Sequence, residues 1–249
     1  MNIGNISVCV ACYPPHIDCL KNLLHSINHQ TLKPSECIVG LSETNDDKKI
    51  ILEQELNAMG FQFPIVISNK DAVCYQAENR NRAIAKATSK YITICDADDV
   101  IHKKRLEIVY EQMEKHNCHA LVHSFTDNIS NTDYNWALNK NPRIVLGEAL
   151  YDAMKKTEGR QLHLPDAFWI HHAYITFHKE VFQHIQQDTN LAGFRYGRCL
   201  SVSDVKKLTG RFVRQEGEDS KFVRDIIKFF GKNNKTMVFV DLPLVLYNR

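Results

Sequence analysis

Three aspartates that directly follow an apolar run are the residues of this chain best suited to chemistry. Asp96, Asp98 and Asp99 lie within four positions and come straight after the apolar segment 91–95. An apolar run of this length, with helical patterns on both sides, predicts a strand buried in a parallel sheet. Ligands of such sheets bind beyond the carboxyl ends of the strands, where neighbouring carboxylates repel one another unless a cation joins them. The position after a buried strand favours a Mg²⁺ or Mn²⁺ site shared with substrate phosphates over an acidic turn or a helix N-cap.

A second acidic pair, Glu218 and Asp219, stands 120 residues after Asp98 and follows Gly217. The apolar spacing after this pair predicts a helix, so the two side chains lie at a helix N-terminus. Acidic side chains cap helices there and are stabilised by the helix dipole. On its own the pair therefore indicates capping rather than catalysis, and only tertiary structure could bring it to the first cluster.

The elements around the first cluster alternate between strands and helices. We expect strands at 6–11, 36–41, 64–68, 91–95 and 120–125, and helices at 16–29, 47–59, 75–88 and 102–117. This alternation predicts a mostly parallel sheet with right-handed crossovers and flanking helices. The periodicity weakens over 127–165 and 188–216. Further elements are expected at 174–178 (strand), 179–187 (helix), after 217 (helix), and at 237–240 and 244–247 (strands separated by Pro243).

Composition narrows the class of protein. A length of 249 residues with 44% hydrophobic and 24% charged residues predicts one globular domain. The net charge of +2 and the lack of a basic stripe interleaved with aromatic residues argue against nucleic-acid binding. No apolar stretch reaches the length of a membrane span, and the N-terminus lacks a signal-peptide pattern, so we expect a cytoplasmic location. Cys9 and Cys12 have metal-motif spacing, but residues three apart on a strand point to opposite faces.

Seven segments form a longer pattern. They are residues 6–13, 24–39, 78–84, 96–99, 174–182, 217–224 and 243–249. In this order they resemble the inverting family 2 glycosyltransferases of the GT-A fold. That family carries P-T-Y-N at the end of its first strand, A-R-N-x-G-I in a helix, D-x-D after a central strand and G-E-D at a helix start. Here the D-x-D motif is Asp96-Ala97-Asp98-Asp99.

The resemblance implies a single Rossmann-like GT-A domain over residues 1–249. Residues 1–126 would bind the nucleotide sugar, and the mixed region 127–249 would form the acceptor side. The implied reaction moves a sugar from a nucleoside-diphosphate sugar, with a UDP-sugar the expected donor, to a glycan or other acceptor hydroxyl. Asp98 would bind Mn²⁺ or Mg²⁺ directly, Asp96 would be a second ligand nearer the ribose, and Asp219 would be the general base. The implied donor-site residues are Ala11, Tyr13, Ser42, Glu43, Arg80, Asp96 and Ala97.

Several positions depart from the family pattern or stay open. The family usually has V-D-D-G-S after its second strand, whereas Val39-Gly40-Leu41-Ser42 carries no aspartate. Ser42 or Glu43 is the candidate replacement, and the nucleotide base is left open. Arg80 either orients the donor and the acidic loop or forms a salt bridge on a helix surface. His171 and His172 are either additional ligands or ordinary loop residues.

Two other functions compete with the transferase. A nucleotidyltransferase normally has a Gly-rich, basic loop after its first strand, but Tyr13-Pro14-Pro15-His16 has neither glycine nor lysine. The other alternative is a non-catalytic domain that binds a nucleotide sugar or a glycan, which the missing V-D-D-G-S keeps open. The oligomeric state cannot be inferred from these patterns.

Overall fold

The computed structural model describes the first half of the chain almost completely and parts of the second half. The described residues are 2–126, 134–138, 144–146, 163–164, 168–169, 175–185, 191–192, 200–201, 225, 229–230, 233 and 235–246. Every structural statement below concerns these residues.

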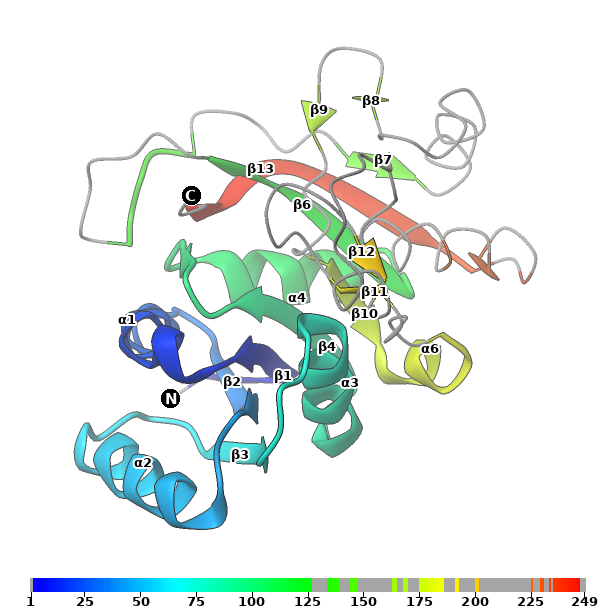
Figure 1. Ribbon diagram of the computed structural model, residues 1–249. Helices are drawn as coiled ribbons and strands as arrows, with labels where there is room; N and C mark the ends of the chain where they lie inside the picture. The colour runs from blue at the N-terminus through cyan, green and yellow to red at the C-terminus, as the bar shows by residue number, and fades with distance from the viewer. Residues whose placement is uncertain are drawn as a thin grey trace.

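Strands and helices alternate through the first half, as the periodicity predicts (Figure 1). In chain order they are β1 (Ile3–Cys12), the 3₁₀ turn η1 (Pro14–His16), α1 (Ile17–Asn28), β2 (Lys33–Ser42), α2 (Asp46–Ala58), β3 (Ile65–Lys70), α3 (Gln76–Lys86), β4 (Tyr91–Asp96), β5 (Val100–Ile101), α4 (Arg105–Lys115) and β6 (Ala120–Thr126). The later elements are β7 (Ile144–Leu146), β8 (His163–Leu164), β9 (Phe168–Trp169), β10 (Ile175–His178), α6 (Lys179–His184), β11 (Leu191–Ala192), β12 (Leu200–Ser201) and β13 (Met237–Leu246).

One large sheet organises the described part of the molecule. Its strand order is β3-β2-β1-β4-β10-β6-β13-β5, and β7 also pairs with β13. Strands β3, β2, β1 and β4 are parallel, as are β6 and β13, whereas β10 is antiparallel to both of its neighbours. The predicted α/β fold with a mostly parallel sheet is therefore confirmed. Because β10 inserts between β4 and β6, strands from 1–126 and 127–249 share one sheet, while the functional division into two halves stays a prediction.

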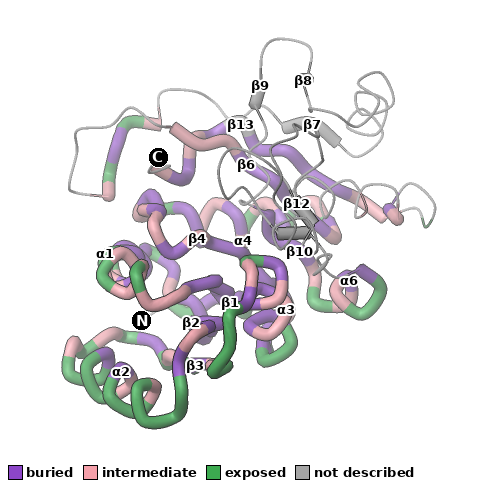
Figure 2. The backbone as a smooth tube through the Cα atoms, viewed as in Figure 1, coloured by how far each residue is buried: buried purple, intermediate pink, exposed green. Residues whose placement is uncertain are grey.

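Two apolar clusters cover the two faces of this sheet. Leucines of α1 and α2 and apolar residues of α4 pack in one cluster, and Ala83 and Ile84 of α3 pack with Val181 of α6 in the other. Strands β1, β2 and β4 are largely buried, as the tube view shows (Figure 2), whereas the edge strand β3 is only partly buried. Cys9 and Cys12 belong to different clusters, so their spacing does not bring the two thiols together. Burial on both faces explains the uninterrupted apolar runs of β1 and β4.

The C-terminal strand differs from the prediction. Two strands separated by Pro243 were expected from the sequence, but β13 runs continuously from Met237 to Leu246. Its register against β6 shifts between Val240 and Pro243 and again between Pro243 and Leu246. Proline has no N–H to donate to a neighbouring strand, so it occupies an irregular position of the ladder.

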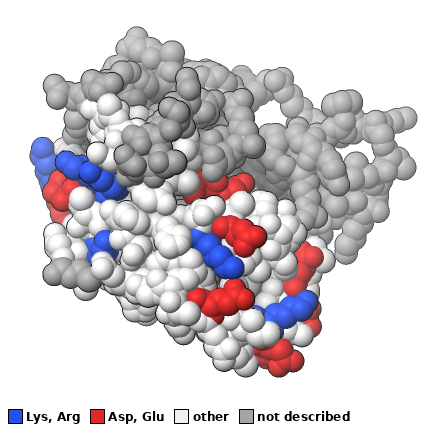
Figure 3. Space-filling view, turned by 90° about the vertical axis from the view of Figure 1, so that its left-hand side faces the viewer, with Lys and Arg blue, Asp and Glu red and all other residues white. Residues whose placement is uncertain are grey.

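The chain after the acidic loop also differs, because residues 100–101 form the short strand β5 and α4 begins only at Arg105. Among the described residues, no helix is both long and apolar enough to span a bilayer. Over the described part of the face shown in Figure 3, lysines and arginines are interspersed with aspartates and glutamates.

Candidate functional site

Strands β1, β2 and β4 bring the predicted site residues to one edge of the sheet. Ala11 of β1 pairs with both Gly40 of β2 and Asp96 of β4. Since the three strands are parallel, their carboxyl ends lie side by side. The segments that follow them, which begin with Tyr13, Glu43 and Ala97, therefore leave the sheet at the same place. This edge is where an open α/β sheet binds its ligand.

The acidic motif forms a tight turn at the end of β4. The Asp99 N–H donates to the Asp96 carbonyl at 3.2 Å. Asp96 and Asp98 are partly exposed, whereas Ala97 and Asp99 are buried. The N-cap of α4 is Lys104, so the alternative of an N-cap formed by Asp98 or Asp99 is wrong. The two predicted metal ligands are thus the two carboxylates of the motif that retain exposed surface.

The electrostatics of Asp98 favour a cation beside it. Burial raises the pKa of the Asp98 carboxyl above its ordinary value, and the nearby Asp96 carboxylate raises it further, whereas charges on His16 and Arg80 act in the opposite direction. A divalent cation beside these two carboxylates would favour the ionised form of Asp98. No three His, Cys, Asp or Glu side chains converge as a ready metal centre within the described ranges. Two carboxylates suit Mg²⁺ or Mn²⁺, which complete their shells with water and substrate phosphates.

Arg80 of helix α3 contacts the first carboxylate of the acidic turn. Its side chain is completely buried, and Nη2 donates to Asp96 Oδ1 at 2.5 Å. The Asp96 side chain is only 15% exposed. The alternative of a salt bridge on a helix surface is therefore wrong, because a buried guanidinium in this position holds the first carboxylate of the motif in place.

Helix α3 also ties together the ends of β1 and β2, which the sequence analysis did not anticipate. Asn79 Nδ2 donates to the Cys12 carbonyl at 3.0 Å and to Ser42 Oγ at 3.2 Å. Arg82 Nη2 donates to Asn79 Oδ1 at 2.7 Å and to the Leu41 carbonyl at 3.1 Å. The polar first half of α3, with two asparagines and two arginines in four positions, was the available signal.

At Gly40, strand β2 packs closely against helix α3. A Cβ at this residue would lie 2.0 Å from the Asn79 carbonyl oxygen and 2.7 Å from its carbonyl carbon. Any side chain here would force the helix backbone away. The family pattern has aspartate where this chain has Gly40. Close packing against α3 explains the glycine, because it leaves no room for a side chain.

The two candidates for the missing aspartate differ in their surroundings. The Ser42 side chain is fully buried, and its hydroxyl accepts a hydrogen bond from Asn79. This bond links the end of β2 to helix α3. Glu43 is partly exposed and has a φ of +56°, in the left-handed region. Its N–H donates to the Ala72 carbonyl at 3.0 Å, and the Thr44 N–H donates to the Lys70 carbonyl at 3.2 Å. Contact of either residue with a nucleoside stays a prediction.

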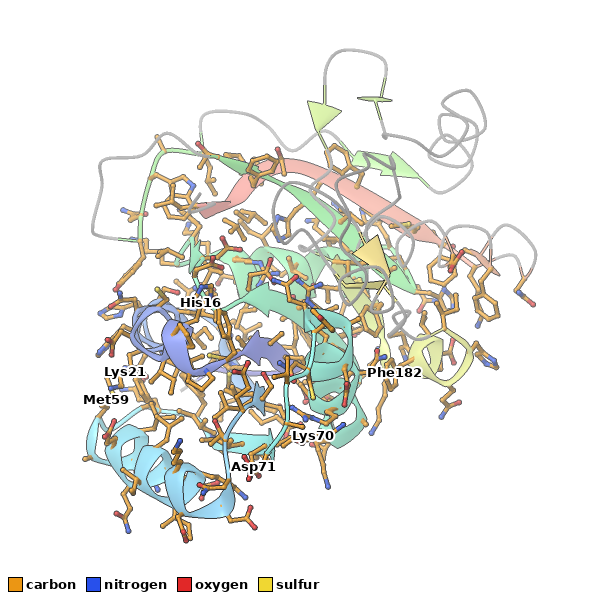
Figure 4. The ribbon with its side chains drawn as sticks, in the orientation of Figure 1. His16, Lys21, Met59, Lys70, Asp71 and Phe182 are labelled. Carbon is orange, nitrogen blue, oxygen red and sulfur yellow. The ribbon has the colours of Figure 1, made fainter. Side chains whose placement is uncertain are left out.

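The end of β3 and the loop that follows it lie next to the end of β2. Lys70, the last residue of β3, and Asp71 are labelled in Figure 4. Lys70 Nζ lies 2.5 Å from Glu78 Oε1. On the β1 side, Ala11 is buried and Tyr13 is half-buried. The hydroxyl of Tyr13 lies 3.2 Å from His16 Nε2. The described residues thus bring together Ala11, Tyr13, Ser42, Glu43, Arg80, Asp96, Ala97 and Asp98.

Three other candidates cannot be placed in this site. Asp219, His171 and His172 lie outside the described residues, as does Glu218. Their predicted roles stay predictions.

Comparison with known proteins identifies the family. The family model described as Glycosyl transferase family 2 matches residues 7–186, which include most of β1, the acidic turn and β10. The chain belongs to glycosyl transferase family 2. An uncharacterised glycosyltransferase of Methanocaldococcus jannaschii is 31% identical over 120 residues, which are 48% of this chain and 41% of the relative.

Solved structures of glycosyltransferases share the fold. S. aureus TarS, crystallised in complex with UDP, is 15% identical and superposes with a TM-score of 0.59 over 96% of this chain and 57% of its own. The mannosyltransferase PcManGT from Pyrobaculum calidifontis, in complex with GDP-Man and Mn²⁺, is 12% identical with a TM-score of 0.54, over 99% and 57% of the two chains. The expected GT-A fold is confirmed. This family 2 chain spans less than two thirds of the length of each of these proteins.

Proposed function

We propose that this protein is a metal-dependent inverting glycosyltransferase that moves a sugar from a nucleoside-diphosphate sugar to an acceptor hydroxyl. The observation that carries the proposal is the pair Asp96 and Asp98 at the carboxyl edge of the sheet, with Arg80 fixed on Asp96. Membership of glycosyl transferase family 2 supports the reaction class.

Asp96 and Asp98 would hold the metal, for which Mn²⁺ and Mg²⁺ are the candidates. Both are carboxylates on one short turn, and their mutual repulsion suits a hard divalent cation. When bound, the metal supplies positive charge that stabilises the departing nucleoside diphosphate. Asp98 is the proposed direct ligand. Asp96, which still pairs with Ala11 of β1, is the proposed second ligand, nearer the ribose as the family resemblance implies.

The other residues of the edge would position the donor. Arg80 would hold the Asp96 carboxylate in a fixed orientation. Tyr13 offers an aromatic face and a hydroxyl at the end of β1, and Glu43 offers a carboxylate at the end of β2. Ala11 and Ala97 have small side chains, which would take up little of the space beside the donor.

Asp219 is the proposed general base, on the strength of the G-E-D resemblance. An ionised carboxylate would accept the proton of the acceptor hydroxyl while its oxygen attacks the anomeric carbon. Attack on the face opposite the leaving diphosphate inverts the configuration at that carbon.

UDP-sugars are the proposed donors, and GDP-sugars are the alternative. The TarS structure contains UDP, and the mannosyltransferase structure contains GDP-Man with Mn²⁺. Both nucleotides therefore belong in a donor screen, and the proposed acceptor is a glycan or another hydroxyl compound.

The test is a donor screen with and without Mn²⁺ on the wild type and on Asp98→Asn. Ligand binding to the folded state raises the unfolding temperature. We expect stabilisation by a nucleoside diphosphate that needs Mn²⁺ in the wild type and is lost in Asp98→Asn. Asp47→Asn, which changes an exposed aspartate of α2, is the matched control and should behave as the wild type. Equal binding in the presence of a chelator would show that the metal role is wrong.

The non-catalytic alternative is tested with the same donors. Incubation with acceptors, followed by analysis of the anomeric configuration of the product, should show inversion. Tight, Mn²⁺-dependent donor binding without transfer or donor hydrolysis across a broad acceptor screen would instead favour a binding domain.

A further inference from the structure

The segment that follows β1 holds a histidine rigidly beside the acidic turn. Residues Pro14, Pro15 and His16 form the turn η1, in which the His16 N–H donates to the Tyr13 carbonyl at 2.9 Å. Two successive prolines restrict the backbone torsions of this turn. His16, which is labelled in Figure 4, directly precedes helix α1, and α1 packs against β5. The position of His16 is therefore set before any ligand binds.

The His16 ring has a defined neighbour. It lies 4.5 Å from the Tyr13 ring, measured between centroids, with the two planes tilted by 47°. Its Nε2 shares a hydrogen bond with the Tyr13 hydroxyl at 3.2 Å. When the hydroxyl donates to Nε2, the neutral ring carries its proton on Nδ1 and can donate from that atom to another group.

His16 also lies at the same edge of the sheet as the acidic turn. Strand pairing explains this, because Ala11 of β1 pairs with Asp96 of β4 and the two chain segments leave the sheet together. The turn η1, which contains His16, begins two residues after the end of β1. His16 comes from the β1 side of the edge, and Asp98 comes from the β4 side.

We propose that His16 binds the diphosphate of the donor, with a ring N–H donating to a phosphate oxygen. This inference rests on the proposed function, because it assumes that the donor phosphates sit at Asp98. The diphosphate would then be bound from two sides, through the carboxylates of β4 and the imidazole that follows β1. A role for His16 as a third metal ligand is less well supported, because the described residues hold no converging set of three ligands.

The test compares UDP with uridine, and GDP with guanosine, all in the presence of Mn²⁺. Binding of the diphosphates is measured by calorimetry and that of the nucleosides by NMR titration. We expect His16→Gln to weaken diphosphate binding about 10- to 100-fold, the usual worth of a hydrogen bond to a charged group. Nucleoside binding should stay within about twofold.

Two variants separate the phosphate contact from other effects. Tyr13→Phe removes only the hydroxyl that meets His16, and we expect a smaller loss of diphosphate affinity than in His16→Gln. His25→Gln changes another half-buried histidine, which packs on Phe61 and lies on α1, and should bind both ligands as the wild type does.

The outcomes are distinct. A His16→Gln protein that binds the diphosphate as well as the wild type overturns the assignment of His16 and leaves the proposed function intact. An equal loss for nucleoside and diphosphate also overturns it, because His16 would then only shape the site. A wild type that binds neither UDP nor GDP with Mn²⁺ overturns the proposed function and the His16 assignment together.

Discussion

The Nη2 atom of Arg80 lies 2.5 Å from Oδ1 of Asp96, and the arginine side chain has no exposed surface. Arg80 belongs to α3, which packs on one face of the sheet, and Asp96 is the last residue of β4. Their contact therefore links this helix to the carboxyl edge of the sheet. A buried guanidinium must be paired, and Asp96 is its partner at the surface of the site. Any change at this pair therefore affects both the fold and the acidic turn.

Arg80→Met should destabilise the protein by about 3–5 kcal/mol, because it removes one partner of a buried ion pair. The measurement is urea-induced unfolding without ligand. Arg80→Lys keeps a positive charge without the planar fork, so we expect it to recover part of the stability but little of the Mn²⁺-dependent donor affinity. Full donor affinity in Arg80→Lys would contradict an orienting role.

Gly40→Ala should move α3 away from β2, because the new Cβ would lie 2.0 Å from the Asn79 carbonyl oxygen. We expect a loss of about 1–3 kcal/mol or more, as for other overpacked positions, together with weaker donor binding. Gly60→Ala is the control. Gly60 has a φ of +68° and open space around it, so this change should cost about 1–2 kcal/mol through backbone strain and leave donor binding unchanged. Equal effects of the two variants on binding would argue against a role for the α3–β2 contact in the site.

Glu43→Gly should keep or slightly raise stability, because glycine adopts the left-handed backbone of Glu43 without strain. If the carboxylate contacts the nucleoside, the same change should weaken binding of UDP or GDP and reduce discrimination between them. Glu43→Asn retains a side chain that tolerates this conformation and serves as the comparison. Unchanged affinity for both nucleotides in Glu43→Gly would exclude the contact.

Stability should fall as the pH drops below about 6.5, because the histidines buried in the folded state stay neutral there. Burial and the adjacent Arg105 hold the pKa of His123 well below its ordinary value, and burial lowers the pKa of His102 and His119. Below pH 6.5 the unfolded chain takes up protons that the folded protein does not, and each such group costs up to about 1.4 kcal/mol per pH unit.

At His123 the hydrogen bond from Arg105 also disfavours protonation of the ring. Nε2 accepts from Arg105 Nε at 2.8 Å, so the proton sits on Nδ1, which donates to the Ser124 carbonyl at 2.8 Å. Gln can accept from Arg105 in the same way but does not titrate. Urea unfolding between pH 7.5 and 5.5 should therefore show a shallower loss of stability in His123→Gln than in the wild type. Identical pH dependence in the two proteins would assign the proton uptake elsewhere.

Asp219→Asn should lower the rate of transfer by roughly 10²–10⁴, the usual worth of a positioned general base. Asparagine keeps the size and the capping ability of aspartate, so stability and donor binding should change little. Steady-state rates and donor titrations on the same preparation check both expectations. Retained transfer would move the base elsewhere, with Glu218 as the next candidate.

The sequence alone determined the parts of this protein that depend on local patterns. The apolar run 91–95 predicted the central strand, because burial on both faces leaves no polar alternation. The alternation of strands and helices predicted the mostly parallel sheet, and the motif order predicted the family. The acidic turn was found because three carboxylates after a buried strand have few purely structural explanations.

Tertiary structure decided what depends on contacts between distant segments. The sequence left Arg80 between a surface salt bridge and an orienting residue, and only the tertiary structure showed that its side chain is buried against Asp96. The roles of Gly40 and Asn79 emerged from the close approach of α3 to β2, which no local pattern encodes. The insertion of β10 between β4 and β6 likewise depends on pairing across more than 50 residues of sequence. Such contacts arise from packing in three dimensions, and the spacing of residues along the chain carries little information about them.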